Sequence, residues 1–260
     1  MPQKTLVFIN GAWVNSACWD QMKLYFEDLG YKCLTPDWPF KNRNVPELNS
    51  APDPGLAHLG ISEIVNHYAE FLKSIESPVL IGHSFGGLFV QMLLERGLGI
   101  AGVALNSAPP KGVFAFYPSS FRSNYKVIAR PFGWKKIHHI SPGNFAYAFT
   151  NNLTPEGQRD AYNTYVVPET GRIFFQAALS IFNDSTKIDF AKLKQPLLLI
   201  SGSKDHICPA AQVRGNFAKY KGMSNVTYQE FAGKSHWIIA EPGWQDVADT
   251  IDSWLKQKLG

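Results

Sequence analysis

Residues 78–87 read Pro-Val-Leu-Ile-Gly-His-Ser-Phe-Gly-Gly, and this stretch decides the fold. Its start, residues 79–81, is apolar without alternation, which predicts a strand that is covered on both faces. Residues 88–94 are apolar nearly all round and predict a buried helix that ends near Gly97. The Gly-x-Ser-x-Gly sequence between them is typical of a nucleophile elbow, a strained strand-to-helix turn with Ser84 at its tip.

The two flanking glycines are expected to make this turn possible. A Cβ atom at Gly82 or Gly86 would strike the neighbouring strand or helix. The turn should hold the Ser84 hydroxyl at the carboxyl edge of a sheet and aim the first helix amides at an oxygen placed beside it. Taken alone, the motif also fits a Gly/Ser turn without chemistry, so the rest of the chain has to decide.

Length and composition indicate an ordinary globular protein. The 260 residues are 45% apolar and 18% charged, which suits one α/β domain with an insertion as well as two domains. The net charge of +4 is small, and the nearest thing to a basic patch is Arg130, Lys135 and Lys136. Because a solvated face explains such a group, we predict no nucleic-acid partner.

The cysteines and the apolar runs bear on location. Cys18, Cys33 and Cys208 are an odd, scattered set, which predicts free thiols in a reducing compartment. The amino end has no secretory apolar region, and no apolar run reaches about 18 residues. We therefore predict a cytoplasmic protein without a membrane partner. The adjacent His138 and His139 do not share a face, and we expect neither a metal nor a cofactor.

Strands and helices alternate along most of the chain, which predicts a doubly wound sheet of about six strands, mostly or wholly parallel. Ligands of such sheets bind beyond the carboxyl ends of the strands. The expected strands are residues 6–9, 31–35, 79–81, 100–105, 196–201 and 226–231, and the helices lie near 19–29, 61–72, 88–94, 210–220 and 244–255.

Two segments depart from this alternation. Residues 107–194 are rich in aromatic side chains and broken by prolines, which predicts helical pieces. Since they are inserted between two strands, we predict a helical cap over the site and a core made of residues 1–106 and 195–260. The Pro-rich stretch 36–60 is too long for a plain connector and is expected to be a loop of the kind that covers a site.

A serine nucleophile needs a base within hydrogen-bond reach and a group that orients the base. Both are expected at later strand ends, in the order Ser, acid, His. His236 follows the last strand and is the candidate base, whereas His83 lies inside the elbow and should point into the scaffold. Asp205 follows strand 196–201 and is the candidate acid, with Asp37 in reserve.

The tetrahedral intermediate of acyl transfer needs two amides aimed at its oxyanion. Phe85, directly after the serine, is expected to give one. Ala12, in the loop after the first strand, is expected to give the other, because Gly11 lets this backbone come close. The neighbouring Trp13 and, beside the candidate base, Trp237 are predicted to contact the substrate.

These segments resemble the α/β-hydrolase family over nearly the whole core. Residues 82–87 resemble the family's elbow, residues 196–209 its acid turn, and residues 235–242 its histidine segment. The resemblance implies the triad of Ser84, Asp205 and His236. It also implies a six-stranded, wholly parallel sheet, because the chain begins at the family's third strand.

One departure concerns the oxyanion loop. Many members have His-Gly where this chain has Asn10-Gly11, although asparagine is able to support the loop by hydrogen bonds. The short start and residues 10–13 resemble the branch of methyl esterases and hydroxynitrile lyases. Those lyases carry a lysine after the catalytic histidine, so Trp237 argues against cyanohydrin chemistry. Dehalogenases and epoxide hydrolases of this fold use an aspartate nucleophile, and Ser84 argues against both.

The sequence thus predicts a serine esterase that acts on a small apolar or aryl carboxylic ester through an acyl-enzyme on Ser84. Two alternatives stay open. One is C–C bond hydrolysis or perhydrolysis on the same triad, and the other is a receptor-like binding protein with little turnover. The natural substrate, its acyl and alcohol parts, and the oligomeric state do not follow from the sequence.

Overall fold

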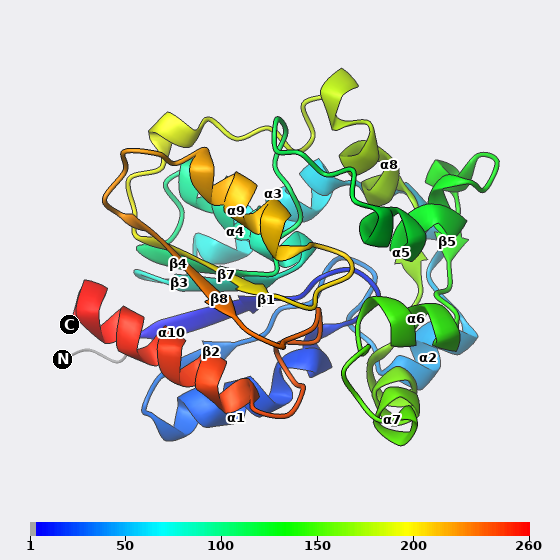
Figure 1. Cartoon of the computed structure of the whole chain (residues 1–260), viewed down its shortest axis with the longest axis horizontal. Coiled ribbons are helices and arrows are strands. Elements are labelled where there is room, and N and C mark those ends of the chain that lie inside the picture. The colour runs from blue at the N-terminus through cyan, green and yellow to red at the C-terminus, as the bar shows by residue number, and fades with distance from the viewer. Residues whose placement is uncertain (1–3) are drawn as a thin grey trace.

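A six-stranded sheet forms the centre of the computed structural model, which describes residues 4–260 (Figure 1). The strand order is β2-β1-β3-β4-β7-β8, and every neighbouring pair is parallel, as predicted. The strands are β1 (Thr5–Ile9), β2 (Lys32–Leu34), β3 (Val79–His83), β4 (Ala101–Leu105), β7 (Leu197–Gly202) and β8 (Val226–Phe231).

Helices cover both faces of this sheet. On one face lie α1 (Asp20–Asp28) and α10 (Trp244–Leu259), and on the other lie α3 (Ile61–Leu72), α4 (Phe85–Glu95) and α9 (Ala210–Ala218) (Figure 1). Because β3, β4 and β7 are covered on both sides, all of their residues are buried. This explains why these strands are apolar without alternation.

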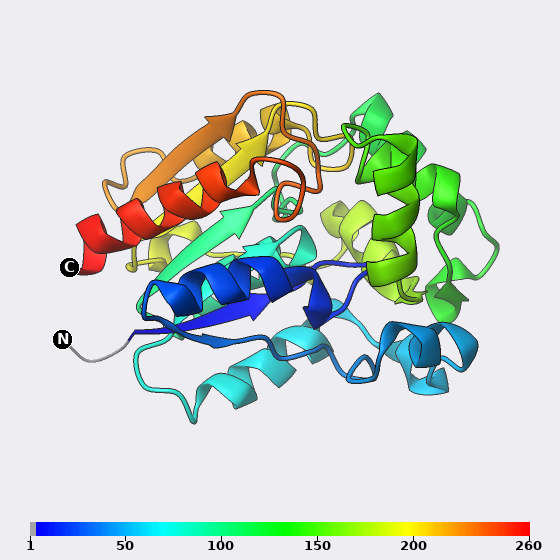
Figure 2. The same ribbon diagram turned by 90° about the horizontal axis from the view of Figure 1, so that it is seen from below.

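The segment between β4 and β7 projects beyond the carboxyl ends of the strands (Figure 2). It contains helical pieces, as expected, and also a short antiparallel pair that the sequence did not indicate. We refer to residues 107–194 as the cap. Its elements are α5 (Pro118–Ile128), α6 (Pro142–Ala148), α7 (Pro155–Tyr165), α8 (Arg172–Ala178), β5 (Ile137–His138), β6 (Glu169–Thr170) and the 3-10 turns η3 (Gly133–Lys135), η4 (Ser180–Phe182) and η5 (Phe190–Lys192).

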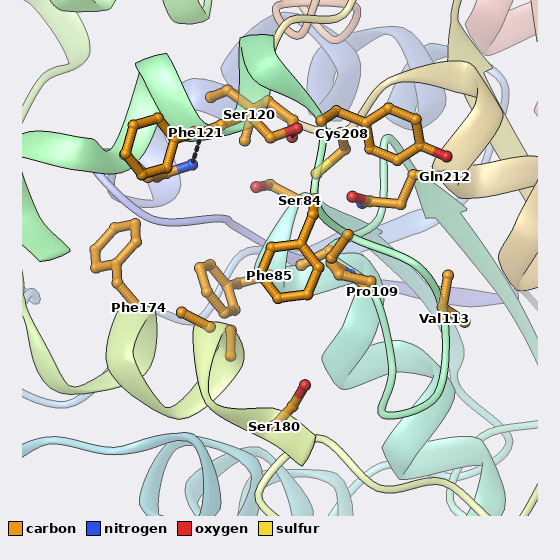
Figure 3. A pocket seen from close by; sticks show the side chains of 18 of the residues that line it. Ser84, Phe85, Pro109, Val113, Ser120, Phe121, Phe174, Ser180, Cys208 and Gln212 are labelled. Carbon is orange, nitrogen blue, oxygen red and sulfur yellow. Dashed lines mark hydrogen bonds between the residues drawn. The ribbon is translucent and has the colours of Figure 1, made fainter. Parts of the chain in front are cut away.

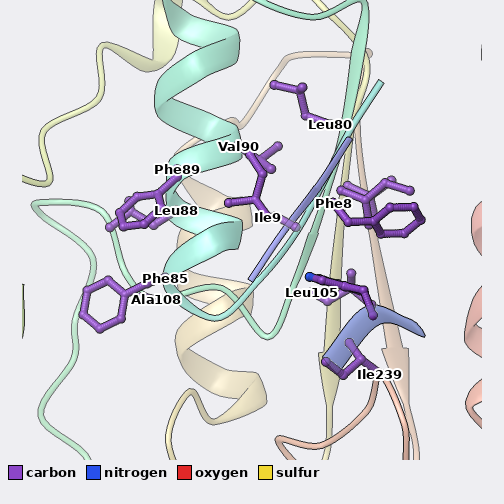
Figure 4. Packing of buried hydrophobic residues seen from close by; sticks show 14 of the residues in the cluster. Phe8, Ile9, Leu80, Phe85, Leu88, Phe89, Val90, Leu105, Ala108 and Ile239 are labelled. Atoms are coloured by element: carbon purple, nitrogen blue, oxygen red, sulfur yellow. The ribbon is translucent and has the colours of Figure 1, made fainter. Parts of the chain in front are cut away.

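The cap and the elbow enclose a cavity. Ser84 lies in its wall, with α5 on one side and the end of α8 on the other (Figure 3). Beneath the cavity, side chains of α4 pack against the central strands, where Leu80, Val90 and Leu105 are completely buried (Figure 4). The carboxyl edge of the sheet therefore rests on a buried apolar core.

Residues 36–60 were expected to be a loop that covers a site, but they are partly helical and do not line the cavity. They contain helix α2 (Val45–Ser50) and the 3-10 turn η2 (Pro54–His58), and another such turn, η1 (Ser16–Trp19), precedes α1. The side chain of Asn44 accepts from the Glu47 amide, and a proline stands in the first turn of α2. Such caps signal a helix start even in a Pro-rich stretch.

Two further expectations concern cysteines and membrane segments. The cysteines at positions 18, 33 and 208 are buried and unpaired, as predicted. Within residues 4–260, none of the helices combines the length and the apolar character that crossing a bilayer requires.

Candidate active site

The elbow places Ser84 in an unusual backbone conformation. Its φ is 58° and its ψ is −121°, values that strain any residue other than glycine. Its amide donates to the carbonyl of Leu105 at 2.9 Å, which ties the turn to β4. A Cβ atom at Gly82 would lie 2.2 Å from the Gly86 oxygen, and one at Gly86 would lie 2.1 Å from the Ile9 oxygen. Only glycine fits at both flanking positions.

His236 and Asp205 are hydrogen-bonded, with 2.7 Å between Nδ1 of the imidazole and Oδ2 of the carboxylate. Both side chains are completely buried. The other carboxylate oxygen accepts the amides of Ile207 at 2.7 Å and Cys208 at 2.9 Å, which fix the orientation of Asp205. Among the described residues, Nε2 of His236 has no hydrogen-bond partner. The buried Asp205 carboxylate therefore holds the His236 imidazole in place through Nδ1, while Nε2 makes no hydrogen bond within the described residues.

The histidine loop lies directly against the elbow. Nε2 of His83 donates to the carbonyl oxygen of His236 at 2.7 Å, and the centres of the two rings are 4.6 Å apart. His83 points into the scaffold, as the sequence indicated, and the next residue in the chain is Ser84. The structure thus brings the elbow, the acid turn and the histidine loop together at the carboxyl edge of the sheet. Asp37, the reserve acid, instead accepts the amide and hydroxyl of Ser16.

Asn106 connects these segments and was missed by the sequence reasoning. It follows β4 with a φ of 45°, which is in the left-handed region. Its side-chain amide donates to the Ser235 carbonyl at 2.9 Å, and its side-chain oxygen accepts the Gly202 amide at 2.7 Å. Asn106 therefore joins the end of β4 to the acid turn and the histidine loop. The sequence feature that could have identified Asn106 is its position as a polar residue directly after a buried strand.

The loop after β1 passes close to the serine. A Cβ atom at Gly11 would lie 2.7 Å from the Cβ of Ser84, so a side chain is excluded there. The Asn10 side chain donates to the carbonyls of Gly11 at 3.1 Å and Val14 at 2.8 Å, which is the supporting role expected of it. Among the hydrogen bonds of residues 4–260, none uses the amide of Ala12 or of Phe85 as its donor.

A buried ion pair holds the far side of this loop. Lys41 and Glu169 contact each other and are both completely buried. The Glu169 carboxylate accepts the Trp13 amide at 3.1 Å, and the Lys41 ammonium donates to the Val14 carbonyl at 3.2 Å. The partners come from the 36–60 stretch and the cap, and no local pattern pointed to either.

The cavity has a volume of about 710 Å³ and is lined mostly by apolar side chains (Figure 3). Trp13 lines it, together with Ser84, Ala12 and Phe85. Among the described residues, none that lines it is charged and none comes from the 36–60 stretch. Trp237, which was expected to contact substrate, lies outside this lining. It is buried, with its ring against Phe145, Phe149 and Tyr165.

Burial lowers the pKa of His83 well below its ordinary value of 6.5, and the neighbouring His236 lowers it further. The unfolded chain therefore binds a proton on this residue that the folded chain does not bind. Its contribution to stability is complete above the unfolded pKa and is lost as the pH falls below it. Acid should therefore weaken the fold through this buried group.

We expect the free energy of unfolding to fall by about 1 kcal/mol between about pH 7.5 and about pH 5.5 on account of His83. The His83→Gln variant should show a pH dependence that is smaller by this amount in urea denaturation. His58→Gln, at an exposed position, is the matched control. An unchanged pH dependence in His83→Gln would contradict the assignment of a neutral buried histidine.

Comparison with known protein families matched residues 6–250 to the alpha/beta hydrolase family. A search of curated protein sequences returned no match. Among solved structures, the chain is similar to a monoacylglycerol lipase from Paleococcus ferrophilus, with 22% identity, a TM-score of 0.71 and coverage of 96% of this chain and 93% of the lipase.

Two further solved structures are similar over almost their whole length. A pyrethroid hydrolase from Sphingobium faniae is 18% identical, with a TM-score of 0.71 and 97% coverage of both chains. A methylesterase from Arabidopsis is 15% identical, with a TM-score of 0.67 and coverage of 96% of this chain and 98% of the methylesterase. At these identities the likeness establishes the fold.

Proposed function

The chain belongs to the alpha/beta hydrolase family, and from that premise we propose that it is a serine hydrolase that cleaves a carboxylic ester of a small apolar or aryl compound. Ser84 is the nucleophile, His236 the general base, and Asp205 the residue that orients the imidazole. The observation that carries the proposal is the 2.7 Å hydrogen bond of His236 to Asp205, next to an elbow serine in the cavity wall.

The first half of the reaction forms an acyl-enzyme. Nε2 of His236 takes the hydroxyl proton of Ser84 as its Oγ attacks the ester carbonyl carbon. The buried Asp205 carboxylate stabilises the imidazolium that results. When the C–O bond to the alcohol breaks, His236 returns the proton to the leaving oxygen, and the alcohol departs.

In the second half, His236 removes a proton from a water molecule, which attacks the acyl carbon. The tetrahedral intermediate collapses, the proton passes to Oγ of Ser84, and a carboxylic acid is released. In both halves the free amides of Ala12 and Phe85 stabilise the oxyanion. Loss of one such donor typically costs ~3 kcal/mol of transition-state stabilisation.

The cavity supports the substrate class. Its volume of about 710 Å³ fits a small molecule, and its uncharged, mostly apolar lining favours neutral apolar groups. The similar structures named above are a lipase, a pyrethroid hydrolase and a methylesterase, which agrees with ester hydrolysis at the level of the family. That the cap controls access to Ser84, and that the protein is cytoplasmic, remain predictions.

We expect a fluorophosphonate to label one residue, Ser84, stoichiometrically, and the protein to turn over p-nitrophenyl butyrate many times. Peptide mapping identifies the labelled residue, and a series of p-nitrophenyl esters of increasing acyl length measures how much of the cavity an acyl chain fills. Labelling without turnover would favour a receptor-like protein. Cleavage of vinylogous 1,5-diketones with poor ester turnover would favour C–C bond hydrolysis on the same triad.

A further inference from the structure

Exposed apolar side chains are concentrated around the mouth of the cavity. Of the twelve large apolar side chains that are exposed among the described residues, nine belong to the cap. We call five of these the apolar rim, which consists of Phe114, Phe116, Phe121, Ile181 and Phe182. They are 62%, 70%, 67%, 62% and 81% exposed, respectively.

The rim surrounds the entrance from two sides. Four of its five residues also line the cavity, so each of them touches both the solvent and the interior. These four are Phe114, Phe116, Phe121 and Ile181. Phe121 lies on α5, whereas Ile181 and Phe182 lie on η4, next to Ser180 on the opposite wall (Figure 3). Apolar groups that a soluble monomer would normally cover are therefore arranged around one opening.

The charges on α5, the helix that carries Phe121, have one sign. Residues 96–155 contain no aspartate or glutamate. Arg122 and Lys126 on α5, and Arg130 just after it, are exposed, and within residues 4–260 none of the three forms an ion pair. We call these three residues the basic flank.

The carboxylate nearest to the rim in sequence does not offset this charge. Asp184 follows η4 and is paired with two lysines, Lys111 at 2.8 Å and Lys187 at 3.4 Å. Lys111 lowers the pKa of this carboxylate. The part of the cap that carries the rim therefore combines exposed apolar side chains with positive charges on α5 and just after it that form no ion pair among the described residues.

From this combination we propose that the mouth docks on the surface of an anionic lipid bilayer. Phenylalanine and isoleucine side chains at a boundary with water insert among the acyl chains, while arginine and lysine bind the negative headgroups. A second copy of the chain fits less well, because pairing two such mouths would place two basic flanks together. Docking requires no membrane-spanning helix, and it would place the cavity entrance on the lipid phase, where apolar esters dissolve.

The test uses the full chain with Ser84→Ala, so that lipid hydrolysis cannot alter the vesicles. Flotation is measured with vesicles of phosphatidylcholine alone and with vesicles that also contain phosphatidylserine. We expect binding to the anionic vesicles at least about tenfold tighter than to the neutral ones, weakening as salt is added. Because no catalysis is measured, this result is independent of the proposed esterase activity.

Variants separate the two parts of the surface. Phe182→Ser, which does not line the cavity, should weaken binding to both vesicle types, and Lys126→Glu with Arg130→Glu should remove the preference for anionic lipid. Leu24→Ser, at a position that is 62% exposed on α1, is the matched apolar control. Lys23→Glu with Lys32→Glu, outside the cap, is the charge control, and both controls should bind like the parent.

Turnover of soluble p-nitrophenyl butyrate by these variants in a chain that retains Ser84 reports whether they fold. Failure of the parent to bind either vesicle type overturns the proposal, and so does binding that the controls weaken equally. Sedimentation of the protein without lipid tests whether the rim instead binds a second copy of the chain. Self-association that Phe182→Ser abolishes would identify the rim as an interface between copies and would also overturn the lipid proposal.

Discussion

Replacing Ser84 with alanine is expected to lower kcat/KM for a p-nitrophenyl ester by about four to six orders of magnitude. The alanine removes one oxygen and keeps the Cβ that the elbow already accommodates. The side chain is almost fully buried, and its hydroxyl is not part of the hydrogen bonds that hold the turn. Stability should therefore stay close to that of the parent, while covalent catalysis is lost.

The measurement pairs steady-state kinetics with fluorophosphonate labelling and urea denaturation. Ser123→Ala is the matched control, because Ser123 is also a buried serine but lies in the cap on α5, with its hydroxyl donating to the Ser119 carbonyl at 2.9 Å. It should retain activity and labelling. Near-normal ester turnover by Ser84→Ala would remove this residue from the mechanism, even if the fold is as described.

The parts of the fold that were predictable are those in which neighbours in sequence determine the structure. Continuous apolar runs predicted the buried strands, because both faces of a parallel sheet are covered. Ser84, Asp205 and His236 each follow a strand of this sheet, and parallel strands end at one edge. Their convergence therefore followed from the order of the elements, without any knowledge of long-range contacts.

The parts that were missed depend on side-chain direction or on distant partners. Trp237 follows His236 directly, yet its ring packs beneath the cap and does not line the cavity. A loop has no periodicity from which this direction could be read. Helix α2 was missed because the prolines of residues 36–60 were interpreted as breakers, although one of them occupies the first turn of the helix.

The ion pair between Lys41 and Glu169 joins distant parts of the chain and could not be predicted from the sequence. Breaking it should have the largest effect on stability. Glu169→Gln leaves the Lys41 ammonium buried without a counter-charge. Removal of one partner from such a pair is expected to lower the free energy of unfolding by about 3–5 kcal/mol. Glu70→Gln breaks the exposed pair with Lys73 and is the matched control, with an expected effect below about 1 kcal/mol.

The double variant Lys41→Met with Glu169→Leu separates stability from catalysis. It removes both charges, so most of the lost stability should return. The Trp13 amide nevertheless loses its acceptor, and the Val14 carbonyl loses one of its two donors and keeps the Asn10 side chain. Trp13 keeps a φ of 70° that its surroundings must impose. The adjacent Ala12 amide should then be less well placed for the oxyanion.

We therefore expect this stable double variant to show a kcat about tenfold below that of the parent, with a smaller change in KM, because an oxyanion donor acts mainly in the transition state. Urea denaturation and ester kinetics are measured on Lys41→Met, Glu169→Leu and the double variant, which together form a double-mutant cycle. Glu169→Gln and the control Glu70→Gln are measured beside them. If kcat recovers together with stability, the pair supports only the fold. If kcat stays low, the ion pair between the cap and the 36–60 stretch positions the oxyanion loop, and catalysis depends on a contact 128 residues apart in sequence.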